Sequence, residues 1–132
     1  MNKWVSRVAV MAAIGGGYYF LSNNIRQPKV VSVVAVPAFS EAGAQGEAVF
    51  QGTCAACHGV ELTGTELGPP LIYPAYRPVF HSDYAITSAI KYGVVQHHWQ
   101  FGSMPPQSDI AAGEIALLIA YIREMQAANG IN

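Results

Sequence analysis

The stretch that decides the fold is GTCAACHG, residues 52–59, which holds the two cysteines of the chain, Cys54 and Cys57, with His58 directly after them. Cys-x-x-Cys-His is the signature of covalent haem attachment. Two thiols at this spacing reach the two vinyl groups on one porphyrin edge from a single helical turn. The next residue then lies under the iron, where its imidazole is the proximal ligand. We therefore predict one covalent haem c on Cys54 and Cys57, with His58 as an axial ligand.

Other uses of the cysteine pair fit less well. A structural zinc site needs two more Cys or His ligands at paired spacing, and no such pair is evident in the sequence. A thioredoxin-like redox pair belongs in a βαβ pattern, which the flanking sequence lacks. A disulfide across two residues would be strained and would stabilise the fold little. Haem attachment is the interpretation that remains.

A second axial ligand is predicted in HHWQFGSMPPQ, residues 97–107, where Met104 precedes two prolines. A thioether binds iron weakly and stays bound only if its loop presents it with little entropic loss. Gly102 permits a bend, while Pro105 and Pro106 stiffen the exit from it. We therefore expect Met104 on the haem face opposite His58, where a soft sulfur donor raises the reduction potential. The alternative to iron ligation is a buried position in the core, and this is our interpretation of Met125.

Histidines of the same loop offer a different sixth ligand. His97 or His98 could displace Met104 and give a low-potential bis-histidine haem, although surface or loop-packing positions are the more ordinary expectation for both. Several aromatic or basic side chains in the two long loops can hydrogen-bond a haem propionate. These residues, for which plain loop packing is the alternative, are Tyr73, Tyr76, Arg77 and Trp99.

Three helices are predicted, over residues 40–51, 82–93 and 108–130. Serine begins the first two as an N-cap, and apolar residues recur at helical spacing in the third. Between them lie loops rich in glycine and proline, over residues 59–81 and 94–107. Three short helices cannot enclose loops of this length around a dry core, so we expect something other than side chains to fill the middle.

Four motifs in this order resemble the class I cytochrome c family, over roughly residues 40–130. The motifs are GEAVF (46–50) ahead of CAACHG (54–59), GPPL (68–71), SMPP (103–106) and IAYIR (119–123). The resemblance implies an all-α fold of about three core helices and long loops around one haem. It also implies that Gly46 and Phe50 cross the last helix at Tyr121, and that the carbonyl of Pro69 accepts a hydrogen bond from His58.

The N-terminal segment has the pattern of a membrane-directing sequence. Lys3 and Arg7 precede an apolar run of 14 residues, 8–21, which at ~1.5 Å per residue covers roughly 21 Å of a ~30 Å hydrocarbon layer. Trp and Tyr residues lie near the two ends of the run, and no small-x-small site for signal cleavage follows soon after it. Both features favour an uncleaved hydrophobic helix. A cleaved signal, cut after Ala38, is the alternative. We divide the chain into an anchor or signal (1–21), a linker (22–39) and a cytochrome c domain (40–132).

Charge is distributed unevenly along the chain. Four of the seven basic residues lie in the first 29 positions, and all eight acidic residues follow from Glu41 onward. This pattern argues against nucleic-acid binding and predicts redox partners with a basic docking surface. Hexacoordinate iron leaves no open position for substrate, so we expect an electron carrier and no enzyme. Because thioether bonds form outside the bacterial inner membrane, we expect a tethered domain that faces the periplasm, or a soluble periplasmic protein if the signal is cleaved.

Two further classes of function stay open at this stage. The first is a fixed electron-transfer subunit of a membrane dehydrogenase or terminal oxidase complex, for which the small residues 15–17 would permit close helix contact. The second is an enzyme or gas sensor with an open haem face, which requires that Met104 does not bind the iron.

Overall fold

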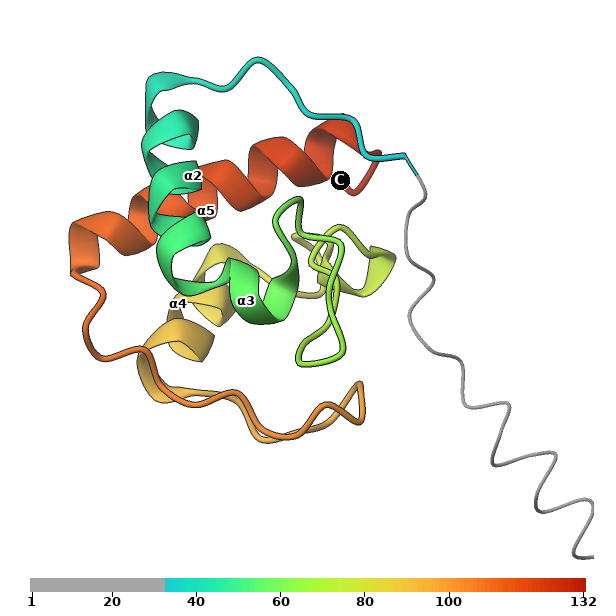
Figure 1. Cartoon of the computed structure of the whole chain (residues 1–132), viewed down its shortest axis with the longest axis vertical. Coiled ribbons are helices and arrows are strands. Elements are labelled where there is room, and N and C mark those ends of the chain that lie inside the picture. The colour runs from blue at the N-terminus through green and yellow to red at the C-terminus, as the bar shows by residue number, and fades with distance from the viewer. Residues whose placement is uncertain (1–32) are drawn as a thin grey trace, which may run out of the picture.

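The computed structural model describes residues 33–132, which form helices joined by long loops with no β-strand among them (Figure 1). This confirms the all-α expectation for the body of the protein. The predicted N-terminal hydrophobic helix lies outside the described residues, and within 33–132 no helix is long and apolar enough to cross a membrane. The elements are α2 (Glu41–Thr53), α3 (Ala55–His58), the 3-10 helix η1 (Pro74–Tyr76), α4 (Asp83–Tyr92) and α5 (Ala112–Ala128).

Side-chain caps and glycine account for several of the helix ends. Ser40 Oγ accepts a hydrogen bond from the Gly43 amide at 3.0 Å at the start of α2. Ser82 Oγ does the same for Ala85 at the start of α4. Helix α4 ends at Gly93, whose φ of +75° is a conformation that favours glycine. The two serines therefore act as the N-caps that the sequence predicts.

Helices α2 and α5 cross one another (Figure 1), and Gly46 lies at the contact, as the resemblance implies. A Cβ atom at Gly46 would overlap the carbonyl oxygen of Leu117 on α5, so only glycine allows this approach. One turn later, Phe50 packs on Tyr121 with ring centroids 5.2 Å apart. Both rings are almost fully buried, and the core of the domain is built around them.

Residues 33–39 run in extended form from the C-terminal end of α5 to the start of α2 (Figure 1). The backbone N–H and C=O of Ala35 both pair with the Asn129 side-chain amide, at 3.0 and 2.8 Å. Phe39 also packs on Tyr121, with ring centroids 5.2 Å apart. The last part of the segment interpreted as a linker is therefore attached to the domain, and any free spacer ends before Ala35.

Candidate haem site

A cavity of about 570 Å³ lies among the helices and loops. Cys54 and His58 line it from the α2–α3 region, Met104 from the loop after α4, and Leu118 and Ile122 from α5. The volume is within the range of small-molecule and cofactor sites, whose walls are mostly apolar. A well-packed core has no voids of this size. The cavity agrees with the expectation that a group other than side chains occupies the middle.

His58 is held in the state that a metal ligand requires. Its Nδ1 lies 2.9 Å from the carbonyl oxygen of Pro69. Because a carbonyl only accepts, Nδ1 carries the proton and Nε2 keeps its lone pair. Burial lowers the pKa of His58, and the hydrogen bond to Pro69 opposes this only in part. The imidazole is therefore neutral at physiological pH, with Nε2 available to iron.

The loop after α3 folds back on the helix and so brings Pro69 to His58. The Gly64 amide donates to the His58 carbonyl at 2.7 Å, and Thr65 Oγ1 donates to the Cys57 carbonyl at 2.8 Å. Gly68 lies against the Cys57 backbone, since a Cβ atom there would be 2.9 Å from the Cys57 oxygen. The first residue of the GPPL motif is therefore a glycine because it lies in close contact with the backbone of the haem-binding motif.

The two cysteines form no disulfide with each other and lie in different surroundings. Cys54 is half-buried and lines the cavity, whereas Cys57 is exposed. Burial, with a smaller contribution from Cys57, raises the pKa of Cys54 to about 11. This thiol stays protonated at neutral pH, and a redox-active dithiol needs a thiolate. A role for Cys54 as the attacking thiolate of a redox-active pair is therefore disfavoured.

Met104 is held by its backbone as well as by its prolines. The amides and carbonyls of Val94 and Met104 exchange two hydrogen bonds of 2.9 Å in an isolated antiparallel bridge. Gly93, at the end of α4, lies so close that a Cβ atom would be 2.6 Å from the Met104 oxygen. The half-buried Met104 side chain lines the same cavity as His58. In the sequence Gly93 is the last residue of a predicted helix, and nothing there indicates this contact or the bridge.

The loop aromatics form a group at one part of the cavity wall. Trp99 Nε1 donates to the Tyr76 hydroxyl at 2.9 Å, and the rings of Trp99 and Tyr73 meet edge-on at 5.0 Å. Tyr76 and Trp99 line the cavity, whereas Tyr73 and Arg77 are not among its lining residues. Burial raises the pKa of Tyr76, and the bond from Trp99 partly offsets that. The Tyr76 hydroxyl is thus a neutral polar group at the cavity.

Arg77 has an unusual buried atom. Its Nε is shielded from solvent and has no hydrogen-bond partner in the part of the chain that the structure describes. A buried donor of this kind normally has a partner. An anionic group brought by the cofactor, such as a propionate, would supply one. The donor set of Cys54, Cys57 and His58 therefore fits haem, whereas Arg77, which does not line the cavity, would meet only a group that extends past the cavity wall.

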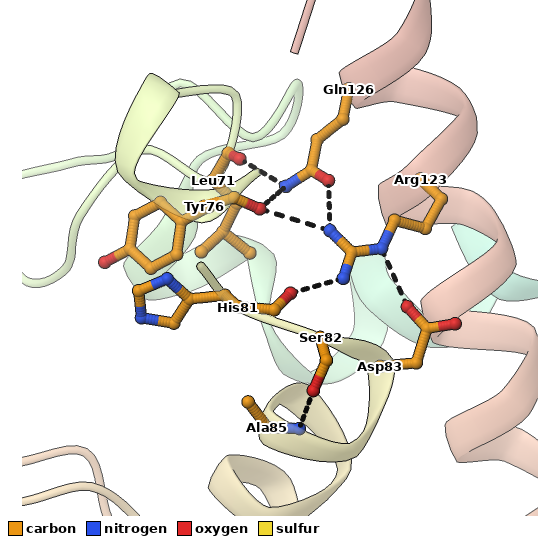
Figure 2. Close-up of polar contacts among 8 residues, drawn as sticks. All are labelled: Leu71, Tyr76, His81, Ser82, Asp83, Ala85, Arg123 and Gln126. Atoms are coloured by element: carbon orange, nitrogen blue, oxygen red, sulfur yellow. Dashed lines mark hydrogen bonds and ion pairs between the residues drawn. The ribbon is translucent and has the colours of Figure 1, made fainter. Parts of the chain in front are cut away.

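A polar network that the sequence analysis missed attaches the loop before α4 to α5 (Figure 2). Arg123 pairs with Asp83 at 2.8 Å and donates to the Gln126 side chain at 2.6 Å. Gln126, which is 1% exposed, donates in turn to the carbonyls of Leu71 and Tyr76 at 2.9 and 3.2 Å. Arg123 also donates to the carbonyls of Tyr76 and His81.

The signal for this network was present in the sequence. Gln126 follows Ile122 by four residues, so it falls on the apolar face of α5. A polar side chain at such a position must find partners when it is buried. Gln126 also lines the cavity, so the network fixes one part of its wall.

His97 and His98, the alternative sixth ligands, lie at exposed positions beside the half-buried His81. All three line the rim of the cavity. Burial, followed by the proximity of His97 and His81, lowers the pKa of His98.

Comparison with protein families identifies a match. The family model of cytochrome c matches residues 43–126, which is more than half of the chain. Neither the curated proteins nor the solved structures contain a significant match. Proteins of the matched family bind haem c covalently through Cys-x-x-Cys-His, and Cys54 and Cys57 have the spacing of that motif. The cofactor of this chain is therefore haem c.

Proposed function

This chain belongs to the cytochrome c family of haem-based electron-transfer proteins, and we propose that it is a membrane-tethered carrier of single electrons with His58 and Met104 as its axial ligands. One observation carries the proposal: the neutral His58 and the backbone-held Met104 line the same cavity as Cys54. Two protein ligands would leave no open position on the iron, which favours a carrier over an enzyme or gas sensor.

Each residue has a distinct task in this proposal. Bound haem supplies a one-electron Fe(II)/Fe(III) couple, whose potential Met/His ligation raises. The carbonyl of Pro69 orients the His58 ring, since it holds the proton on Nδ1. The bridge to Val94 limits the freedom of Met104, so little entropy is lost when its weak sulfur donor is engaged. Arg77 and the Tyr76–Trp99 pair suit the propionates.

The ligand assignment is tested by Met104→Ala. Oxidised wild-type protein should show the weak near-infrared sulfur-to-iron charge-transfer band, and the variant should lose it and bind carbon monoxide when reduced. Met125→Leu is the matched control, because Met125 is buried in α5 and is not among the cavity-lining residues. The control should keep the band. If the band persists in Met104→Ala, Met104 is not the ligand and the proposal fails.

The membrane tether rests on the sequence of residues 1–21, which lie outside the described part of the chain. We propose that this segment is retained in the bacterial inner membrane and that the domain faces the periplasm. Since residues 35–39 contact α5, the spacer is at most 22–34, which when extended reaches roughly 40 Å at ~3.3 Å per residue. That length suits exchange between neighbouring complexes.

Fractionation separates the tether from its alternatives. Mass spectrometry of the mature protein should find peptides upstream of Ser22, and carbonate washing should leave the haem in the membrane fraction. A mature N-terminus near Phe39, with haem in the soluble periplasmic fraction, would rule out the tether. Stoichiometric copurification with a dehydrogenase or terminal oxidase in mild detergent would instead favour the fixed-subunit alternative.

The acidic body suggests a partner with a basic docking surface. Residues from Glu41 onward include all eight acidic residues against three basic ones. Complementary charge increases the rate of encounter and is screened by salt. We therefore expect the rate of electron exchange with a basic redox protein to fall as ionic strength rises, and a rate that is independent of salt would contradict this part of the proposal.

A further inference from the structure

Three histidines cluster at the rim of the cavity. His81, in the loop before α4, and His97 and His98, in the loop after it, each present one ring nitrogen within 4.8 Å of the other two. The rings of His97 and His98 have centroids 4.1 Å apart, and those of His81 and His98 are 5.3 Å apart. With His58 assigned to haem, these are all the remaining histidines of the chain.

Backbone carbonyls prepare two of the three rings as metal ligands. Nδ1 of His81 lies 2.6 Å from the Ala75 carbonyl, and Nδ1 of His97 lies 2.8 Å from the Val95 carbonyl. Because carbonyls only accept, Nδ1 carries the proton in both rings, and Nε2 is left with a lone pair. The same arrangement, in which the second ring nitrogen donates to a carbonyl, orients most metal-bound histidines. His58 has it here as well, through Pro69.

We propose that His81, His97 and His98 form a binding site for one divalent transition-metal ion, with Zn²⁺ and Cu²⁺ as the ions that fit an all-imidazole donor set. Nitrogens on a tetrahedral zinc at ~2.0–2.1 Å lie roughly 3.3 Å from one another. The three nitrogens must approach by no more than about 1.5 Å, and the exposed side chains of His97 and His98 have room to make that adjustment.

Such an ion would connect the two loops that flank α4. His81 lies next to Ser82, the N-cap of α4, while His97 and His98 lie between Val94 and Met104. A metal bound to all three therefore restrains the segment that carries Met104 against the start of α4. The ion binds the three histidines in their folded arrangement, and the unfolded chain does not have this arrangement. Binding should therefore also raise the melting temperature of the protein.

Zinc titration of the full-length holoprotein tests the site. After treatment with a chelator, calorimetric titration with ZnCl₂ at pH 7.5 should show one saturable site per chain. His98→Ala and His97→Ala should each weaken zinc binding at least tenfold and abolish the rise in melting temperature. Glu66→Gln, which removes an exposed carboxylate that is not part of the cluster, is the control and should bind as the wild type does.

The visible spectrum separates this site from haem ligation. The proposal expects an unchanged low-spin spectrum in His98→Ala, because the ring binds the added ion and leaves the iron alone. With Cu²⁺ in place of Zn²⁺, the electron paramagnetic resonance signal should show hyperfine coupling to several nitrogens. In His97→Ala and in His98→Ala, fewer nitrogens should couple to the copper. The proposal is overturned if no saturable binding occurs, if His98→Ala binds zinc as tightly as the wild type, or if that variant loses its low-spin spectrum. Failure of the Met104 assignment would appear separately, as a surviving near-infrared band in Met104→Ala.

Discussion

Gly46→Ala should destabilise the protein far more than its single methyl group suggests. The added Cβ would overlap the Leu117 carbonyl oxygen, which belongs to the backbone of α5 and cannot rotate away. A carbon–oxygen contact needs about 3.3 Å or more, so the helices must separate by roughly 1 Å at the crossing. A gap of that size forfeits a quarter to a half of each dispersion contact across it. The Phe50–Tyr121 pair, one turn away, loses contact as well.

The expected cost is about 2–4 kcal/mol, at or above the usual range for overpacking because a backbone atom is involved. Gly52→Ala is the matched control in the same helix. Nothing lies within 4 Å of its added Cβ, so the better helix propensity of alanine should leave stability unchanged or raise it by about 0.5–1 kcal/mol. The two variants carry the same chemical change in the same helix and differ in what the added methyl group meets.

Guanidinium unfolding of the holoprotein, followed by circular dichroism, measures both variants against the wild type. The midpoint of Gly46→Ala should fall strongly at a similar m value, while that of Gly52→Ala should stay or rise. The reasoning is refuted if Gly46→Ala is as stable as the wild type, or if the two variants are destabilised equally. In the second case helix propensity or haem loading, and not the crossing, would be responsible.

Three further outcomes are expected. Gln126→Leu should cost about 2–4 kcal/mol by chemical unfolding, because two buried loop carbonyls and an arginine lose their partner; an unchanged midpoint would show that water replaces the amide. Burial raises the pKa of Tyr121 to about 12, so the folded state favours the neutral phenol. The contribution of this shift to the free energy of unfolding is fully present below pH ~10 and should be lost as the pH rises towards 12. Tyr121→Phe should therefore lose less stability over this interval, measured by unfolding at pH 9 and pH 11.5. Cys54→Ala with Cys57→Ala should give a chain that is unfolded by circular dichroism and quickly digested by protease, because nothing then fills the cavity; a compact, protease-resistant product would contradict that account.

Local spacing was enough to predict the haem-binding motif and the three longer helices, α2, α4 and α5. The distance between two thiols and the imidazole that follows them depends only on backbone geometry within one turn, so Cys54, Cys57 and His58 could be assigned from the sequence. N-caps such as Ser40 and Ser82 act on amides three residues away, and the apolar period of α5 is equally local. The order of the four motifs added what the family implies, including the approach of Pro69 to His58.

Contacts between distant segments were decided only by the tertiary structure. The bridge that holds Met104 depends on Val94, ten residues earlier, and no local pattern indicates which loop residues will pair. The partners of Gln126 lie on a loop about fifty residues away, so the sequence could show a polar residue on an apolar face without showing its function. The histidine cluster likewise forms because α4 returns the chain to His81, and the attachment of Ala35 to Asn129 joins segments 94 residues apart. Such contacts arise from the path of the whole backbone around the cavity, and a one-dimensional pattern of residue types does not contain that path.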